Sequence, residues 1–298
     1  MLRLSELKLP LDHGDNELQD AVLKRLRIAP DQLLEQRLVK RSVDARHRDR
    51  IQLIYSIDVR VKGEAALLRR IGNKAKVRPA PDTRYRYVGQ AQAGFPETAE
   101  HRPVVVGAGP CGYFAALLLA QMGFRPLLLE RGEAVKQRTL QTFAFWRGEK
   151  TLDPESNAQF GEGGAGTFSD GKLYSQVSDP EHYGRKVLEE LVASGANDEI
   201  LTLHRPHIGT FKLATVVRGL RARIEALGGE VRFNSRVEML RIEPGAEGKP
   251  YQLVGLDLAG GEHIACRHLV LAPGHSARDC FAMLQRIGVA LERKPFSV

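Results

Sequence analysis

Two kinds of hydrophobic pattern run through the first ninety residues. Apolar and polar residues alternate in two segments, as they do in strands that bury one face. Two other segments repeat apolar residues at helical spacing, which is typical of amphipathic helices. Strands are predicted over residues 2–9 and 51–61, and helices over 16–28 and 64–71. Because strands and helices alternate at this small size, we expect residues 1–90 to form a small α+β domain.

The same patterns predict which side chains of this domain are buried. The expected core residues are Leu18, Val22 and Leu26 of the first helix and Ile51, Leu53, Tyr55, Ile57, Val59 and Val61 of the long strand. The polar stretch that follows contains Gly, Pro and Thr, and we expect residues 91–102 to be a flexible linker.

A βαβ unit is predicted at the start of the next segment, residues 103–288. Val104–Val106 and Leu127–Leu129 are short apolar runs, typical of strands buried on both faces of a parallel sheet. The stretch from Pro110 to Met122 is predicted to be the helix between them, with Gly123 at its C-terminal cap. The order of these elements indicates an α/β fold.

The turn between the first strand and this helix carries a phosphate-binding pattern. Gly107, Gly109 and Gly112 form G-x-G-x-x-G, in which the glycines allow a tight turn, a close approach of a diphosphate and close packing of helix on strand. Pro110 fits the first helical turn, where its missing N–H costs little. The free N–H groups and the dipole of this helix would face the diphosphate. Glu130 ends the second strand, where a carboxylate can accept both hydroxyl hydrogens of an adenosine ribose.

A second glycine cluster lies in the stretch NAQFGEGGAGTFSDGKLYS. Glycines at this density cost backbone entropy, so they indicate a backbone that passes close to a flat ligand. Its glycines are Gly161, Gly163, Gly164, Gly166 and Gly171. Thr167, Ser169 and the loop N–H groups are the candidates to hydrogen-bond the edge of that ligand. A flexible surface linker is the alternative.

The remaining pattern continues the order of a nucleotide-binding fold. Residues 213–229 predict an amphipathic helix and residues 230–240 a strand. Gly260-Gly261 is the expected turn of a hairpin. The stretch HLVLAPG then predicts a buried strand that runs into a glycine turn at Gly274.

With GAGPCG, LLLERG and FGEGGAGTFSDGKL in place, the chain resembles flavoproteins of the glutathione-reductase-like class. More narrowly, it resembles a family of uncharacterised FAD-dependent dehydrogenases. The resemblance implies an FAD-binding Rossmann-like domain over residues 103–288 with an inserted hairpin. It implies FAD as cofactor, because Glu130-Arg131-Gly132 matches the flavin version of the motif, and it implies a dehydrogenase.

The resemblance also assigns roles to individual residues. It implies that Ala116 packs the helix on the sheet, that Arg138 contacts the FAD diphosphate, and that the backbone at Val237 lies beside the adenine. An exposed surface position for Arg138 is the alternative. The second glycine cluster would lie against the isoalloxazine ring, where Lys172 could stabilise a reduced flavin; a surface role for Lys172 stays open. Pro273 stands where the family often has Thr, which weakens the assignment of Gly274. His275 is expected to be structural.

Positive charge is concentrated at the start of the chain. Residues 1–102 hold 21 Lys and Arg against 14 Asp and Glu, while the other residues hold 23 against 22. A basic patch can bind nucleic acid, so an RNA-binding protein or a flavin-dependent RNA modifier is the alternative function. A solvated face explains the same charges, and few aromatic residues interleave with them. Nucleic acid is therefore a possible partner but is not favoured.

Three cysteines, Cys111, Cys266 and Cys280, give no disulfide framework and favour a cytoplasmic protein. No C-x-x-C pair occurs, so a dithiol relay is not expected, and Cys111 is interpreted as a small packing residue. No apolar run could span a membrane, no secretion signal opens the chain, and the histidines show no metal-binding spacing. The small-molecule substrate, the catalytic residues and the oligomeric state are unknown at this stage.

Residues 289–298 are expected to begin a substrate domain, with a strand over Val289–Arg293. The family normally closes its site with a later Gly-Asp segment that binds the ribityl chain, and no such segment occurs in this sequence. A second G-x-G-x-x-G for a nicotinamide nucleotide is also absent. We therefore expect the chain to be the first part of a longer protein, with an incompletely enclosed flavin ring.

Overall fold

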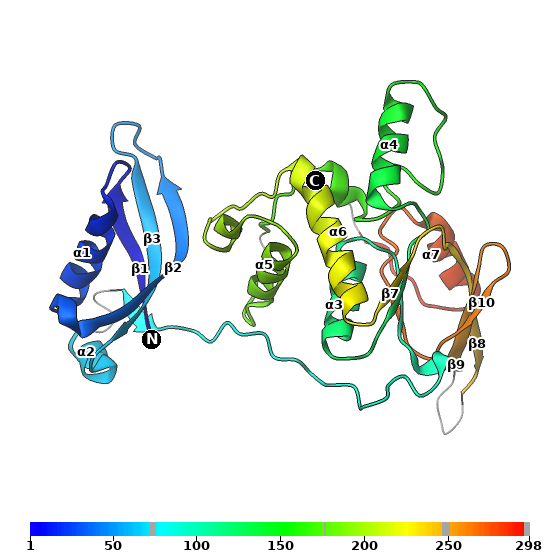
Figure 1. Ribbon diagram of the computed structural model, residues 1–298, viewed down its shortest axis with the longest axis horizontal. Coiled ribbons are helices and arrows are strands. Elements are labelled where there is room, and N and C mark those ends of the chain that lie inside the picture. The colour runs from blue at the N-terminus through cyan, green and yellow to red at the C-terminus, as the bar shows by residue number, and fades with distance from the viewer. Residues whose placement is uncertain (72–75, 176, 246–250, 295–298) are drawn as a thin grey trace. The chain divides into compact units, whose positions relative to one another are not determined.

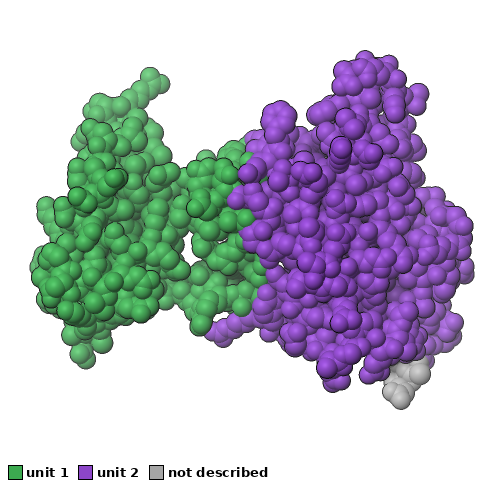
Figure 2. All heavy atoms as spheres, in the orientation of Figure 1, with its two compact units in different colours: residues 1–85, 172–192, 197–208 green, residues 86–171, 193–196, 209–298 purple. Residues whose placement is uncertain are grey.

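A computed structural model describes residues 1–71, 76–175, 177–245 and 251–294. The chain divides into two compact units, coloured separately in Figure 2. Unit 1 comprises Met1–Tyr85, Lys172–Val192 and Asn197–Ile208, and unit 2 comprises Arg86–Gly171, Ala193–Ala196 and Gly209–Val298. The predicted boundaries at residues 90 and 103 stay predictions; the compact units differ from them chiefly in grouping most of residues 172–208 with the N-terminal region.

Unit 1 begins with a four-stranded antiparallel sheet in the order β2-β3-β1-β4. Its elements follow one another as β1 (Leu2–Pro10), α1 (Asp15–Leu26), β2 (Leu33–Asp44), β3 (Gln52–Val61), α2 (Glu64–Ile71) and β4 (Val77–Pro79). This is the split βαβ arrangement of ferredoxin-like domains. The two helices cover one face of the sheet (Figure 1). The predicted α+β fold of this region is confirmed by these elements.

The hydrophobic core of this region lies between the sheet and the helices α1 and α2. Val22 and Leu26 of α1 and Leu67 of α2 are buried there against alternate residues of the strands. Tyr55, Ile57, Val59 and Val61 are the buried apolar residues of β3, as expected, whereas Leu53 is only half-buried. Ile51 was expected in the strand but precedes it and is half-buried. Unit 1 also holds α5 (Tyr183–Ala193) up to Val192 and a short 3-10 turn, Asp198–Leu201.

Unit 2 is built on a parallel sheet in the order β11-β5-β6-β7. Its strands are β5 (Val104–Val106), β6 (Leu127–Leu129), β7 (Glu230–Arg232) and β11 (Leu269–Leu271). Helix α3 (Pro110–Gln121) joins β5 to β6 as predicted, and Gly123 follows it with a positive φ of 84°. Ala116 is fully buried, as the resemblance implies.

An antiparallel sheet packs on one face of this parallel sheet. It consists of β8 (Val237–Pro244), β9 (Tyr251–Leu258) and β10 (His263–Ala265), and Gly260-Gly261 forms the predicted turn between the last two. Val104 and Val106 share a buried cluster with Val237 and Leu256, whereas α3 covers the other face of β5. Helices α4 (Val135–Trp146), α6 (Thr210–Ala226) and α7 (Arg278–Arg286) complete the unit (Figure 1).

Two expectations concern connecting segments, and the second of them is wrong. The predicted linker stays a prediction; in this stretch the Ala91 amide donates to the Met122 carbonyl at 2.8 Å and the Phe95 ring packs on the Phe124 ring at 5.2 Å. Val289–Arg293 forms no strand, because no neighbouring strand pairs with it in the described chain. The rest of that predicted segment, residues 295–298, lies outside the described residues.

Candidate active site

A cavity of about 610 Å³ opens at the carboxyl ends of the parallel strands of unit 2. Val106, Leu129 and Leu271, the last residues of β5, β6 and β11, line it. In open α/β sheets this edge is where ligands bind, beside the point where the strand order reverses. Nine of the predicted site residues line the cavity: Gly107, Gly109, Pro110, Glu130, Arg131, Gly164, Gly166, Val237 and Gly274.

The phosphate-binding turn is packed too tightly for side chains at two of its three glycines. A Cβ on Gly107 would lie 2.2 Å from the Ala272 carbonyl oxygen, and one on Gly112 would lie 1.8 Å from the Gly107 oxygen. Gly112 therefore packs helix on strand and does not line the cavity. Gly109 differs, because a Cβ there would meet no protein atom closer than the Gly164 Cα at 3.9 Å. The space beside Gly109 is open to a ligand.

The Glu130 carboxylate ties three loops together. Its Oε2 accepts a hydrogen bond from the Ala108 amide at 2.7 Å, and its Oε1 accepts from the Gly132 and Gly161 amides at 2.9 Å each. The side chain is buried and still lines the cavity. A carboxylate offers about four lone-pair positions, so three amides leave room for one more donor.

The second glycine cluster forms an ordered wall beside the phosphate-binding turn. The Gly163 amide donates to the Ala108 carbonyl at 2.8 Å, and a Cβ on Gly164 would lie 3.0 Å from the Gly109 Cα. Gly164 has φ 64° and ψ −166°, a region that essentially only glycine occupies. The two glycine-rich segments thus meet backbone to backbone, as a binding wall rather than the flexible linker of the alternative interpretation.

Arg138 of α4 holds this wall from behind. Its Nη1 donates to the carbonyl oxygens of Glu162 and Gly164 at 2.7 and 2.8 Å, and its Nε donates to the Asn157 oxygen at 2.8 Å. The side chain is fully buried, which lowers the pKa of the guanidinium to about 10, while Glu130 and Glu162 oppose that shift. Arg138 does not line the cavity, and its implied contact with a diphosphate stays a prediction.

Three other predicted residues are also turned away from the cavity. Thr167 is buried and its hydroxyl donates to the Glu162 carbonyl at 3.2 Å, while the Ser169 hydroxyl donates to the Gly166 carbonyl at 2.8 Å. Gly163 is covered by Thr167 and Val217. The Thr167 hydrogen bond is buried and the Ser169 hydrogen bond is exposed, and none of these three residues lines the cavity. Lys172 belongs to unit 1, and its implied role stays a prediction.

Glu162 is a fully buried carboxylate that sequence reasoning did not single out. It accepts from the Tyr113 hydroxyl at 2.7 Å and from the Val135 amide at the start of α4 at 2.6 Å, and the Arg221 guanidinium lies 3.4 Å away. Burial, together with this carboxylate, raises the pKa of Tyr113 well above its usual range. The loop therefore carries its own anchor to α3, α4 and α6.

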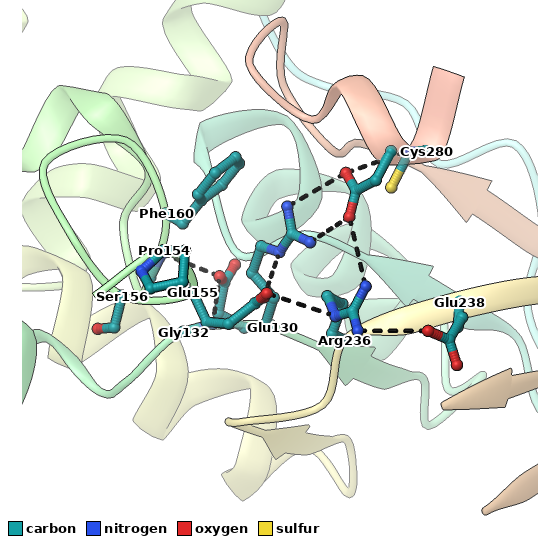
Figure 3. Close-up of polar contacts among 12 residues, drawn as sticks. Glu130, Gly132, Pro154, Glu155, Ser156, Phe160, Arg236, Glu238 and Cys280 are labelled. Carbon is teal, nitrogen blue, oxygen red and sulfur yellow. Dashed lines mark hydrogen bonds and ion pairs between the residues drawn. The ribbon is translucent and has the colours of Figure 1, made fainter. Parts of the chain in front are cut away.

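A ring of four charged side chains lies at the cavity, and we call it the charge ring. Only one of its members, Arg131, was named from the sequence, and the ring was not predicted. Arg131 pairs with Glu155 at 3.0 Å and with both carboxylate oxygens of Asp279; Arg236 lies 3.5 Å from Glu155 and 3.7 Å from Asp279. Figure 3 shows Glu155 and Arg236 together with Phe160. The Phe160 ring packs on the Arg131 guanidinium at 4.4 Å. The four members come from segments up to 148 residues apart, and no local motif signals such a ring.

The three cysteines differ in burial, and Cys111 differs from its predicted role. Cys111 is exposed and lines the cavity, because as the second residue of α3 it points out of the open end of the turn; its interpretation as a packing residue is wrong. Cys266 is buried and burial raises the pKa of its thiol to about 11. Cys280 lines the cavity from α7, and burial raises the pKa of its thiol too. His275 lines the cavity with its Nε2 at 3.3 Å from the Ser276 hydroxyl.

Among the residues that the structure describes, no group of three or more His, Cys, Asp or Glu residues is placed to hold a metal ion. Across residues 1–71, 76–175, 177–245 and 251–294, no helix has the length and apolar character needed to cross a bilayer.

Family models match both ends of the chain. A model described as pyridine nucleotide-disulphide oxidoreductase matches residues 101–291, and a model for a domain of unknown function matches residues 1–60. An uncharacterised protein of Clostridium beijerinckii is 40% identical over 297 residues, which is 100% of this chain and 53% of that relative. The chain thus spans about half the length of this relative. The first match and the parallel sheet confirm the expected α/β, FAD-binding Rossmann-like fold.

Solved structures resemble the chain only weakly. Thermovibrio ammonificans THI4 matches with a TM-score of 0.42 and 17% identity, over 65% of each chain. A 3-ketosteroid-delta4-(5alpha)-dehydrogenase from Rhodococcus jostii matches with a TM-score of 0.33 and 16% identity, over 63% of this chain and 49% of the other. Both TM-scores lie below 0.5, so neither similarity bears on the function of this chain.

Proposed function

Because the chain belongs to the pyridine nucleotide-disulphide oxidoreductase family, we propose that the cavity of unit 2 binds FAD and that the chain is the flavin-binding part of an oxidoreductase. The observation that carries this proposal is the open space beside Gly109, at the first turn of α3, between two glycine-rich segments. A diphosphate needs such an approach to bare backbone.

The residues that line the cavity suit the ADP half of FAD. Helix α3 begins at Pro110 at the edge of the cavity, so its dipole and free N–H groups favour an anion there. The remaining lone pair of Glu130 would accept from a ribose hydroxyl. Val237, at the start of β8, lines the cavity and would lie beside the adenine.

FAD would supply the redox chemistry, and the protein would supply binding, orientation and electrostatics. Gly164 and Gly166 would place a rigid backbone against the ligand, held in shape by Arg138. A dithiol relay is not part of the proposal, since the sequence contains no C-x-x-C pair. The substrate is a small molecule of undetermined class, and a cytoplasmic location belongs to the same proposal.

The alternative of RNA binding gains no support from the sheet of unit 1. RNA-binding modules with a four-stranded sheet stack bases on aromatic residues of the exposed face. On the face away from the helices, Arg3 and Arg37 both pair with the buried Asp58 at 2.7 and 3.1 Å. Tyr55 of β3 is turned into the core. The basic charge of this unit is partly engaged in internal ion pairs.

The decisive experiment is Gly109→Ala. A Cβ at this position meets no close protein atom, so the variant should fold with unchanged thermal stability. The same Cβ would occupy the space of the diphosphate, so we expect FAD affinity in calorimetry to fall at least about tenfold, or 1.4 kcal/mol. Unchanged FAD affinity in the folded variant would refute the proposed site. Gly89→Ala is the matched control, because a Cβ there also meets no protein atom and Gly89 does not line the cavity.

A further inference from the structure

The arginine beside the ribose-binding acid is already neutralised. Arg131 follows Glu130 directly and lines the cavity, with its side chain 13% exposed. Its Nε donates to Glu155 and its two terminal nitrogens donate to the two oxygens of Asp279. These contacts lie at the edge of the guanidinium, and the Phe160 ring covers one of its faces. Three of its five N–H donors have carboxylate partners.

A free arginine at this place would have another use. In dinucleotide-binding folds the acid at the end of the second strand binds the ribose hydroxyls, and a nearby arginine accommodates a ribose 2′-phosphate when the ligand carries one. A phosphate binds such an arginine through two parallel hydrogen bonds from the edge of the guanidinium. In this chain Asp279 takes that edge.

The second arginine of the cavity is neutralised by the same two acids. Arg236 lies within 3.5 Å of Glu155 and 3.7 Å of Asp279, and its Nη2 lies 3.3 Å from Glu238. The charge ring therefore closes on itself with two positive and two negative members. Glu130 adds a further negative charge beside it, so the side chains here leave no net positive charge for a phosphate.

We infer that Glu155 and Asp279 determine ligand specificity by occupying Arg131 and Arg236, so that the cavity accepts an adenine nucleotide with an unphosphorylated ribose and rejects its 2′-phosphorylated counterpart. This inference rests on the proposed nucleotide site and deepens it. A ribose with free hydroxyls needs only Glu130. A 2′-phosphate would need the arginines, would have to displace two carboxylates, and would lie among three negative side chains.

The test compares ADP-ribose with 2′-phospho-ADP-ribose by calorimetry, since the two probes differ only in the phosphate. The unsubstituted protein should bind ADP-ribose at least about tenfold more tightly. In the double variant Glu155→Gln, Asp279→Asn, Arg131 loses both of its carboxylate partners and Arg236 keeps only Glu238. Affinity for 2′-phospho-ADP-ribose should then rise at least tenfold, while affinity for ADP-ribose should change less than about threefold.

Matched variants keep the result decisive. Glu238→Gln removes a carboxylate that touches only Arg236 and leaves the ring closed, so it should keep the original preference. The single variants Glu155→Gln and Asp279→Asn should each give an intermediate gain, and they decide the question should the double variant not fold. Equal affinities in the unsubstituted protein, or an unchanged preference in folded variants, would overturn the inference. Absence of ADP-ribose binding would instead refute the proposed nucleotide site.

Discussion

Glu130 accepts a hydrogen bond from the amide of Gly161 at 2.9 Å, although the two residues lie 31 positions apart. This contact joins the end of β6 to the glycine-rich wall of the cavity. The same carboxylate also holds the turn after β5 through the Ala108 amide. The residue that sequence analysis assigned to the ribose is thus also the residue that brings both glycine-rich segments together.

Glu130→Ala should therefore reduce stability as well as FAD binding. Three amides lose their acceptor, at roughly 1–3 kcal/mol for each buried group, so the free energy of unfolding in urea should fall by at least about 3 kcal/mol. FAD binding should weaken by about 1–3 kcal/mol in calorimetry at a temperature where the variant is folded. Glu133→Ala, a nearby carboxylate outside the cavity lining, should change neither. Loss of stability with unchanged FAD affinity would leave Glu130 a purely structural role.

Gly164→Ala should show whether the wall depends on the backbone conformation of this glycine. Its backbone conformation costs a residue with a side chain about 1–3 kcal/mol, and the added Cβ would press on Gly109. We expect a fall in thermal stability and in FAD affinity. Gly166→Ala has no such strain and should stay within about 0.5 kcal/mol of the unsubstituted protein. Similar stabilities of the two variants would contradict the described conformation of the wall.

Arg138→Ala should loosen the same wall from behind. The carbonyl oxygens of Glu162 and Gly164 lose their donor, so hydrogen exchange at the Gly163 and Gly164 amides should become faster. Arg138→Lys should rescue this only in part, because an ammonium cannot reproduce the fixed fork of a guanidinium. Lys136→Ala, an exposed residue of the same helix, is the control. Unchanged exchange in Arg138→Ala would show that the loop holds its shape without this side chain.

Cys111 should be the one thiol that reacts quickly in the native protein. It is exposed, whereas Cys266 and Cys280 are buried with raised pKa values and remain protonated thiols at pH 8. A colorimetric thiol reagent should titrate one fast equivalent in the folded protein and three in denaturant. Cys111→Ser should abolish the fast equivalent, and FAD should slow it because Cys111 lines the cavity. Fast reaction of Cys280 would contradict its described burial.

Asp58 should make unit 1 sensitive to acid. Burial opposes the charged form, but hydrogen bonds from Arg3 and Arg37 prevail and hold the pKa of this carboxyl below its usual value. Its stabilising contribution is then complete above the usual pKa of about 3.9 and is lost as pH falls through the lower, folded-state value. Hydrogen exchange of β1 and β3 amides should show a gap between the unsubstituted protein and Asp58→Asn that is constant at pH 5 and closes toward pH 2. Asp31→Asn, in an exposed pair, should show almost no gap at any pH.

The hydrophobic pattern located a strand correctly where all of its side chains are buried. The strands Val104–Val106 and Leu127–Leu129 are buried on both faces, so their apolar runs located them. Strand β2 was not predicted, because most of its side chains are exposed and no alternation results. Half-exposed edge strands leave little trace in the order of apolar residues.

At the site, too, only some features could be predicted from the sequence. Glycines that contact backbone could be identified, because only a missing side chain satisfies the packing at Gly107 and Gly112. The direction of a polar side chain could not, and Thr167 and Arg138 face the inside of the loop rather than the cavity. The charge ring depends on Arg131 and Asp279 meeting across the fold, and no spacing along the chain encodes that meeting.

The glycine-rich wall has a consequence for protein engineering. Two of the side chains that fix its path lie outside it, Glu130 on one side and Arg138 on the other, while Glu162 anchors it from within. A transplant of the segment alone into another scaffold would carry its sequence without its shape. A portable version would have to include the two residues that hold it, together with the helix start at Val135.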